Sequence, residues 1–128
     1  MPLVRISIPA GRDKAFAKAV GDGIHDAMIA TVGIPADDRF QVITEHERAL
    51  LVADPHYLGI ERSDGAILVQ ITLRNGRSDD KKRALYRTIV ENLQARAGVR
   101  KEDVVVTLVE NEAIDWSFGN GVAQYAPG

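Results

Sequence analysis

The stretch that decides the fold is MPLVRISI, residues 1–8, in which Val4, Ile6 and Ile8 alternate with the residues between them. An apolar period of two is typical of a strand buried on one face. Proline stands directly behind the methionine, and its small size leads us to expect removal of that methionine. The amine of Pro2 would then titrate near about pH 8, within reach of acid or base chemistry at neutral pH.

The pattern of this stretch returns later in the chain as an ungapped internal repeat with an offset of 65 residues. The identical pairs include Val4 with Val69, Ile6 with Ile71, Gly11 with Gly76, Arg12 with Arg77, Ala19 with Ala84, Ile24 with Ile89, Ala30 with Ala95, Gly33 with Gly98, Asp38 with Asp103 and Glu47 with Glu112. Self-similarity of this kind indicates that one structural unit is present twice.

Each unit predicts a strand, a helix and a second strand. The first helix is expected over residues 12–31 and ends at Gly33, and the strand after it covers residues 39–44. In the second unit Ser78 caps the helix, and residues 104–109 form the last strand. A right-handed crossover makes the two strands of a unit parallel. The expected fold class is therefore α+β, with duplicated β-α-β units forming a four-stranded sheet that has both helices on one face.

We expect a single domain over residues 1–128, with the first unit at residues 2–45, the second at 66–110 and an aromatic tail at 111–128. Residues 45–65 have no clean period and predict a surface linker, with a short strand at residues 50–52. The sheet face opposite the helices is expected to carry both apolar and polar side chains. It is too apolar to remain exposed to water and too polar to form a dry core. Packing against copies of the same chain would cover it, so we expect an oligomer.

The composition excludes several classes of function. The net charge of −2 comes from interspersed acids and bases, and no long apolar run occurs, so we expect neither nucleic acid nor a membrane as a partner. The absence of cysteine excludes disulfides, and the three histidines are too scattered for a metal site. With no signal-peptide pattern at the start, we expect a cytoplasmic protein.

The repeat also separates structural residues from chemical ones, because a duplicated fold needs its structural residues twice and an active site needs its reactive group once. Pro2 breaks the repeat, since it falls on Ile67, and Arg74 breaks it, since it falls on Pro9. The tail at residues 115–125 has no counterpart in the first unit. These residues are the better functional candidates.

Two further candidates do obey the repeat. Arg77 falls on Arg12 and Asp38 falls on Asp103. An arginine after each glycine turn could tie down a helix start, and an aspartate before each second strand could hold a turn. The repeat therefore leaves a structural role open for both residues.

Three motifs carry a family resemblance: DRFQ at residues 38–41, RNGR at 74–77 and DWSFGNGVAQY at 115–125. Together with the proline at position 2 and the duplicated β-α-β unit, they resemble the tautomerase superfamily. Within it the chain is most similar to the malonate semialdehyde decarboxylase group. The resemblance covers essentially the whole chain, and the tail is its most specific part.

The resemblance implies roles for seven residues. Pro2 would be the reactive amine, Asp38 its acidic partner, Arg74 and Arg77 the carboxylate binders, and Trp116, Phe118 and Tyr125 the apolar wall. The family's arginine pair is separated by one residue, whereas two intervene here, and Tyr125 stands where phenylalanine is usual. The resemblance also implies a homotrimer, and nothing in the sequence implies a metal or an organic cofactor.

Three functions are compatible with these residues. The resemblance favours a lyase that decarboxylates a small 3-oxo acid such as malonate semialdehyde, with hydration of an unsaturated acid as a side activity. The first alternative is an isomerase, a keto-enol tautomerase of 2-oxo acids in which Pro2 is the general base. The second is a non-enzymatic oligomeric binding protein built on the same fold.

Overall fold

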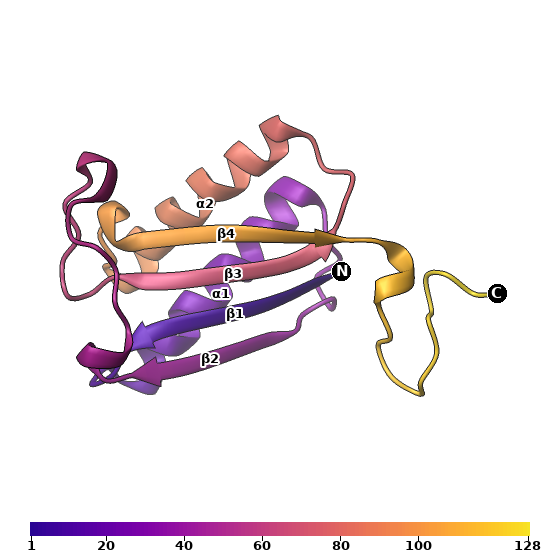
Figure 1. Cartoon of the computed structure of the whole chain (residues 1–128), viewed down its shortest axis with the longest axis horizontal. Helices are drawn as coiled ribbons and strands as arrows, with labels where there is room; N and C mark the ends of the chain where they lie inside the picture. Colours follow the sequence, from indigo (N-terminus) through magenta and orange to yellow (C-terminus); the bar gives the residue numbers. More distant parts are fainter.

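The computed structural model describes residues 1–128. Its main elements in chain order are β1 (Pro2–Pro9), α1 (Lys14–Val32), β2 (Gln41–His46), β3 (Ile67–Arg74), α2 (Asp79–Ala97) and β4 (Val104–Asn111). Short 3-10 turns follow β2 at Arg48–Leu50 and Tyr57–Gly59, precede β4 at Lys101–Asp103 and follow β4 at Ala113–Asp115. The strands form one sheet in the order β2-β1-β3-β4 (Figure 1).

The register of the sheet confirms the duplicated architecture. β1 runs parallel to β2, with Val4 opposite Gln41, and β3 runs parallel to β4. The two units meet where β1 pairs with β3 in the antiparallel sense, with Pro2 opposite Leu73. Because of this pairing, the starts of β1 and β2 lie at the same edge of the sheet as the ends of β3 and β4.

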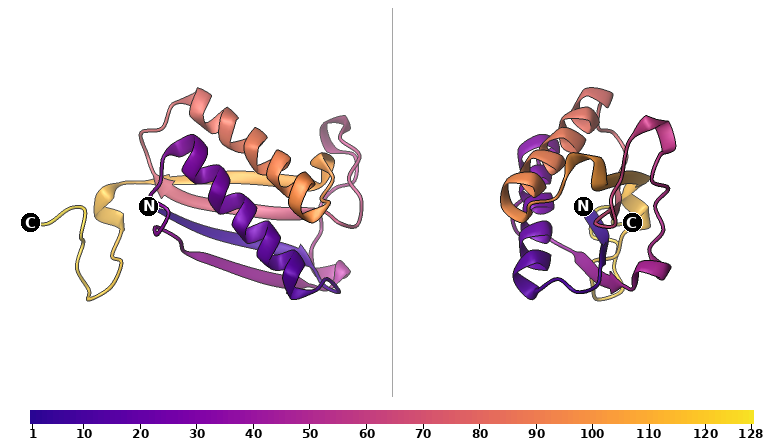
Figure 2. Two further views of the ribbon diagram at one scale, coloured as in Figure 1. Left: turned by 180° about the vertical axis from the view of Figure 1, so that it is seen from behind. Right: turned by 90° about the vertical axis from the view of Figure 1, so that its left-hand side faces the viewer.

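Both helices lie on one face of the sheet, as expected (Figure 2). Asp13 caps α1 by accepting a hydrogen bond from the Phe16 N–H (2.8 Å), so the helix begins at residue 14 rather than 12. Ser78 caps α2 through the Lys81 N–H (3.2 Å), as the sequence predicts. Gly33 and Gly98 end the helices in the left-handed conformation, which glycine adopts without steric cost.

The core fills the space between the helices and the sheet. Alternate residues of β1 and β3 point into it, together with the apolar stripes of both helices. The helices approach closely at Gly23, where an added Cβ would lie 3.1 Å from the Leu93 Cδ2 atom. The Asn92 amide donates to the Gly23 carbonyl across this contact (2.9 Å). No helix is both long and apolar enough to cross a membrane.

The linker between the units contains no strand, so the expected strand at residues 50–52 is wrong. The chain instead forms the 3-10 turn at Arg48–Leu50. Leu50 and Val52 are 71% and 78% exposed, and no strand of the sheet pairs with this segment. The Arg62 guanidinium ties the linker together by donating to the carbonyls of residues 54, 57 and 60.

The other face of the sheet is uncovered in the single chain. Leu3 and Leu68 are half-buried there, and Arg5 lies opposite Gln70 with both side chains exposed. This face has the mixed character that the sequence predicts.

Candidate active site

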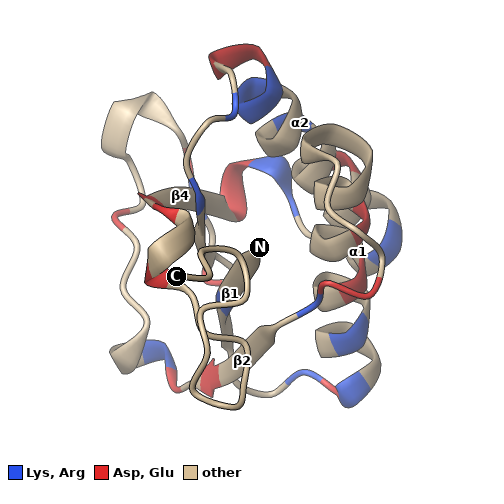
Figure 3. Ribbon diagram, turned by 90° about the vertical axis from the view of Figure 1, so that its right-hand side faces the viewer, with Lys and Arg blue, Asp and Glu red and all other residues tan.

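The candidate site lies at the edge of the sheet where β1 and β2 begin and β3 and β4 end. Pro2 opens β1, Asp38 precedes β2, Arg74 ends β3 and Asn111 ends β4. Figure 3 looks onto this edge and shows the start of the chain between the strands and the helices, with the C-terminal tail close to it. The antiparallel pairing of the two units thus gathers residues that are more than 100 positions apart in sequence.

Asp38 faces the start of the chain. One of its carboxylate oxygens lies 2.8 Å from the α-amino nitrogen of Met1, and the two side chains are only 13% and 6% exposed. In the chain described here Met1 is present, so the Pro2 nitrogen is an amide. The contact defines a largely buried place for a positive charge at the head of β1.

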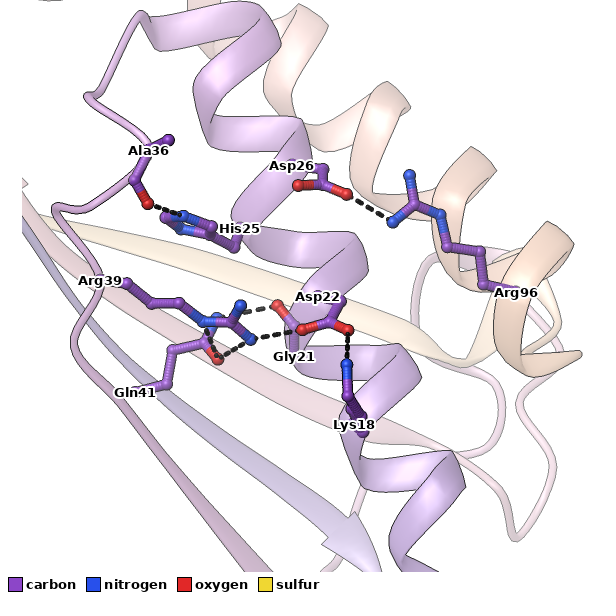
Figure 4. Close-up of polar contacts among 9 residues, drawn as sticks. All are labelled: Lys18, Gly21, Asp22, His25, Asp26, Ala36, Arg39, Gln41 and Arg96. Carbon is purple, nitrogen blue, oxygen red and sulfur yellow. Dashed lines mark hydrogen bonds and ion pairs between the residues drawn. The ribbon is translucent and has the colours of Figure 1, made fainter.

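Asp38 lies in the loop of residues 33–40. The first half of this loop, which follows α1, is attached to that helix. The His25 ring is buried, and its Nε2 atom lies 2.7 Å from the carbonyl oxygen of Ala36 (Figure 4). Because a carbonyl oxygen only accepts, this ring nitrogen carries the proton. A turn in which the Asp38 N–H donates to the Pro35 carbonyl (3.1 Å) follows directly.

The same loop is fixed again where it enters β2. The Arg39 guanidinium donates to Asp22 of α1 (2.7 Å) and to the side-chain oxygen of Gln41 (3.0 and 3.2 Å). The Gln41 amide in turn donates to the Gly21 carbonyl (2.9 Å). Hydrogen bonds from Lys18 and then from Arg39 hold the pKa of Asp22 below its ordinary value. All these contacts are drawn in Figure 4.

Four aromatic rings form a cluster beside Asp38. Phe118 is at its centre: its ring is stacked on Trp116 with centroids 5.2 Å apart, is tilted against Phe40 at 5.4 Å and meets the edge of Tyr125 at 5.8 Å. Trp116 and Phe118 therefore stand side by side, as their spacing of two predicts. Contacts between aromatic rings stabilise the cluster by more than the burial of its apolar surface area alone.

A cavity of about 320 Å³ lies between this cluster and the acidic loop. It is lined by Pro35, Asp37, Asp38, Phe40, Phe118, Gln124 and Tyr125. Trp116 is not part of the lining and instead supports Phe118 from the other side of the stack. The cavity has an acidic wall and an aromatic wall, and it is large enough for a short organic acid.

Hydrogen bonds fix the tail that supplies the aromatic rings. The Trp116 indole N–H donates to the side-chain oxygen of Asn111 (2.7 Å). Gln124 accepts from the Phe118 N–H (2.9 Å) and donates to the Gly119 carbonyl (2.8 Å), which closes residues 118–124 into a loop. The Gln124 side chain thus joins the end of this loop to its start, where Phe118 lies.

The two candidate arginines lie at the same edge but line a separate recess of about 280 Å³ with Val32 and Lys81. Arg74 is exposed at the end of β3. The Arg77 guanidinium turns back to donate to the Arg74 carbonyl (2.6 Å), and its repeat mate Arg12 lies over the ring of Phe16 at 3.8 Å. Both arginines of the repeat thus make local contacts near a helix start.

The structure therefore brings together only part of the residue set expected from the sequence. Asp38, Phe118 and Tyr125 share one cavity near the start of the chain, whereas Pro2, Trp116, Arg74 and Arg77 do not line it. Phe40 and Gln124 also line the cavity, although the sequence did not indicate a site role for either residue. Both lie inside the motifs quoted above, at the third position of DRFQ and near the end of the tail, but the spacing of a motif does not show which of its side chains share a cavity.

Two family models, each described as tautomerase enzyme, match residues 38–119 and residues 2–60. The probable tautomerase YusQ of Bacillus subtilis (strain 168) is 43% identical over 124 residues, which cover 97% of this chain and 98% of the relative. The probable tautomerase YrdN of the same organism is 33% identical over 128 residues, covering 100% and 98%. The chain belongs to the tautomerase superfamily and is an enzyme of that superfamily.

Among solved structures, the chain is similar to malonate semialdehyde decarboxylase. Wild-type, mutant and inactivated forms of that enzyme, studied for decarboxylase and hydratase activities, match with a TM-score of 0.91 at 35% identity, covering 96% of this chain and 95% of the other. A malonate semialdehyde decarboxylase inhibited by 3-bromopropiolate also gives 0.91 at 36% identity, with coverage of 96% and 93%. A fused 4-OT symmetric trimer shares the fold at 23% identity and a TM-score of 0.78, covering 94% of each chain.

Proposed function

We propose that this enzyme decarboxylates a small 3-oxo acid without a cofactor, and that Pro2 is the reactive amine. The observation that carries the proposal is the buried contact between Asp38 and the amino group at the start of the chain (2.8 Å). Removal of Met1 would transfer the free amine to Pro2, which is already held in β1 opposite Leu73. The likeness to malonate semialdehyde decarboxylase over 96% of the chain supports the same reaction class.

The chemistry needs an electron sink at the substrate carbonyl. When the bond between the carboxylate carbon and the α-carbon breaks, its electron pair moves toward the carbonyl and CO₂ leaves. A protonated Pro2 amine would donate a hydrogen bond to the carbonyl oxygen as negative charge develops there. The resulting enolate then takes one proton from solvent at its α-carbon and gives the aldehyde or ketone product, while the Pro2 amine keeps its own proton. Asp38 would keep the amine protonated, because a nearby carboxylate favours the charged form of an amine.

The substrate carboxylate needs a cationic partner, and the acidic wall of the cavity does not supply one. In the proposal Arg74 binds this carboxylate, with Arg77 beside it, since a guanidinium makes paired hydrogen bonds to a carboxylate. Arg74 is the stronger candidate, because its side chain is exposed at the same edge while Arg77 donates to a backbone carbonyl. Trp116, Phe118 and Tyr125 would exclude water and favour the less charged products.

The alternative activity is keto-enol tautomerisation of a 2-oxo acid, and the names of the two bacterial relatives favour it. In this reaction a neutral Pro2 amine takes a proton from one carbon and returns it to another. The arginines would again hold the carboxylate. The two reactions thus differ in the charge of the Pro2 amine at neutral pH.

We also propose that the enzyme works as a homotrimer. The uncovered sheet face, with Leu3 and Leu68 half-buried around Arg5 and Gln70, would be covered by neighbouring copies. A related fold is described as a symmetric trimer. Sedimentation velocity at several protein concentrations would measure the assembly directly.

The test of the proposed function begins with the intact mass of the protein from its native cells, which reports whether Met1 is removed. Turnover of 3-oxo and 2-oxo acids is then measured for the wild type and for Pro2→Ala, and the Pro2 nitrogen is titrated by ¹⁵N NMR. A Pro2 amine protonated up to about pH 8 with release of CO₂ supports decarboxylation. An amine neutral at about pH 7 supports tautomerisation. A retained Met1 contradicts both reactions.

A further inference from the structure

The position of Asp38 depends on a loop with no regular hydrogen-bond ladder of its own. We propose that Arg39 is a positioning residue for Asp38, acting through its ion pair with Asp22 and its hydrogen bonds to Gln41. The inference rests on the proposed function, because it assigns Arg39 to the reaction in which Asp38 takes part. It adds a residue that lies outside the cavity and contacts no reacting group.

The Arg39 side chain links the last part of the loop to the helix. Arg39 follows Asp38 directly in the chain, and its guanidinium spans from Asp22 of α1 (2.7 Å) to the side-chain oxygen of Gln41 at the start of β2 (3.0 Å). Arg39 thereby connects α1, which precedes the loop, to β2, which follows it. A shift of the Arg39 backbone would move the adjacent Asp38 as well.

Gly21 provides independent support for this arrangement. A Cβ on Gly21 would lie 2.8 Å from the Gln41 side-chain oxygen and 3.4 Å from the Arg39 Nη2 atom. Only a residue without a side chain lets these groups come so close to α1. The Gln41 amide uses this approach to donate to the Gly21 carbonyl (2.9 Å).

The contact of His25 with Ala36 fixes the other half of the loop, two residues before Asp38. With this contact and the hydrogen bond from the Val4 N–H to the Phe40 carbonyl (2.9 Å) kept, loss of the Arg39 contacts would loosen only the segment between them, which carries Asp38. The change would therefore be local, and Asp38 is the residue whose placement it would affect.

A positioning role can be separated from a stabilising role because this ion pair is partly exposed. The Arg39 and Asp22 side chains are 39% and 29% exposed, and pairs of this kind contribute little to folding stability. Catalysis is far more sensitive, since a misplacement of about 1 Å can cost about 100-fold in rate. Substitution of Arg39 should therefore reduce turnover much more than stability.

The chain offers a matched control on the same helix. Arg96 of α2 pairs with Asp26 of α1 at 2.6 Å, with side chains 42% and 49% exposed, and has no contact with the loop (Figure 4). Arg39→Met and Arg96→Met each remove one partly exposed arginine–aspartate pair from α1. Only the first removes a contact of the Asp38 loop.

The experiment measures kcat, KM and amide hydrogen exchange for the wild type, Arg39→Met, Arg39→Lys and Arg96→Met. For Arg39→Met we expect kcat to fall about 10- to 100-fold, KM to change by less than about twofold, and exchange of the Asp38 and Arg39 amides to become faster. Arg39→Lys should recover part of kcat, since an ammonium can still pair with Asp22. Arg96→Met should resemble the wild type in all three measurements.

Wild-type kcat or wild-type amide exchange in Arg39→Met would overturn the inference, and so would an equal loss of kcat in Arg96→Met. If the wild type turns over no oxo acid at all, the proposed function fails, and the exchange of the Asp38 amide then decides the positioning claim alone. Faster exchange in Arg39→Met but not in Arg96→Met would support it, and equal exchange would overturn it.

Discussion

Asp38 and Asp103 occupy the same position in the two units, and each carboxylate contacts a nitrogen of the segment that leads into the first strand of its own unit. Asp38 lies 2.8 Å from the Met1 amino nitrogen, and Asp103 accepts from the Ser63 N–H at 2.7 Å. In the second unit the chain continues through this point, so the nitrogen is an amide. In the first unit the contact is made by the amino nitrogen of Met1, which precedes β1 directly.

We expect these two aspartates to respond oppositely to substitution. Asp103 is buried and also accepts from the Ser63 hydroxyl (2.5 Å), so Asp103→Ala removes both hydrogen bonds that hold Ser63 of the linker against the start of β4. This change should lower the free energy of unfolding by about 1–3 kcal/mol, as measured by urea denaturation. Asp38→Ala should reduce kcat more than stability. Equal losses of stability in the two variants would contradict the division of roles.

The charge of the Pro2 amine is expected to depend on Asp38. In Asp38→Asn the carboxylate that favours the protonated amine is lost, so the amine should release its proton at lower pH than in the wild type. A ¹⁵N NMR titration of Pro2 in the processed protein measures this shift. As the pH is raised, decarboxylation by Asp38→Asn should then decline at a lower pH than decarboxylation by the wild type, because the reaction needs the protonated amine. Asp26→Asn, on α1 and away from the loop, serves as the control, and an equal shift there would contradict a specific role of Asp38.

The single tryptophan reports directly on the tail. Gln124→Glu keeps an acceptor for the Phe118 N–H but replaces the donor to the Gly119 carbonyl with a second acceptor, so one of the two hydrogen bonds that close the loop should be lost. We expect the stack of Trp116 on Phe118 to loosen, the indole emission to shift to longer wavelength and KM to rise.

Val122→Thr is the control for the tail, because Val122 lies in the same loop, is 51% exposed and has no side-chain hydrogen bond. It should leave the emission and KM unchanged. Unchanged emission in Gln124→Glu would show that Gln124 does not hold the aromatic wall.

The elements of the fold were predictable because periodicity, caps and the repeat all depend on local sequence. The site was predictable only in part. Phe40 and Gln124 belong to motifs whose spacing says nothing about which side chains share a cavity. The role of Arg39 depends on its contact with Asp22, 17 positions away, which only the packing of the loop on α1 creates. Residues 50–52 misled the prediction because apolar residues alone do not make a strand without a neighbouring strand to pair with.

The decrease of the free energy of unfolding at acidic pH should depend on Asp22. Hydrogen bonds from Lys18, and next from Arg39, lower the pKa of Asp22 below 3.8 in the folded chain. A carboxyl group with a lowered folded pKa contributes stability above its unfolded pKa and loses that contribution as the pH falls through the folded value. The difference in unfolding free energy between the wild type and Asp22→Asn should therefore be constant near about pH 6 and shrink below about pH 4. Urea denaturation across this range measures it. Lys18→Met should reduce the pH-dependent part more than Arg39→Met, because the Lys18 hydrogen bond is the larger cause, and the reverse order would contradict this account.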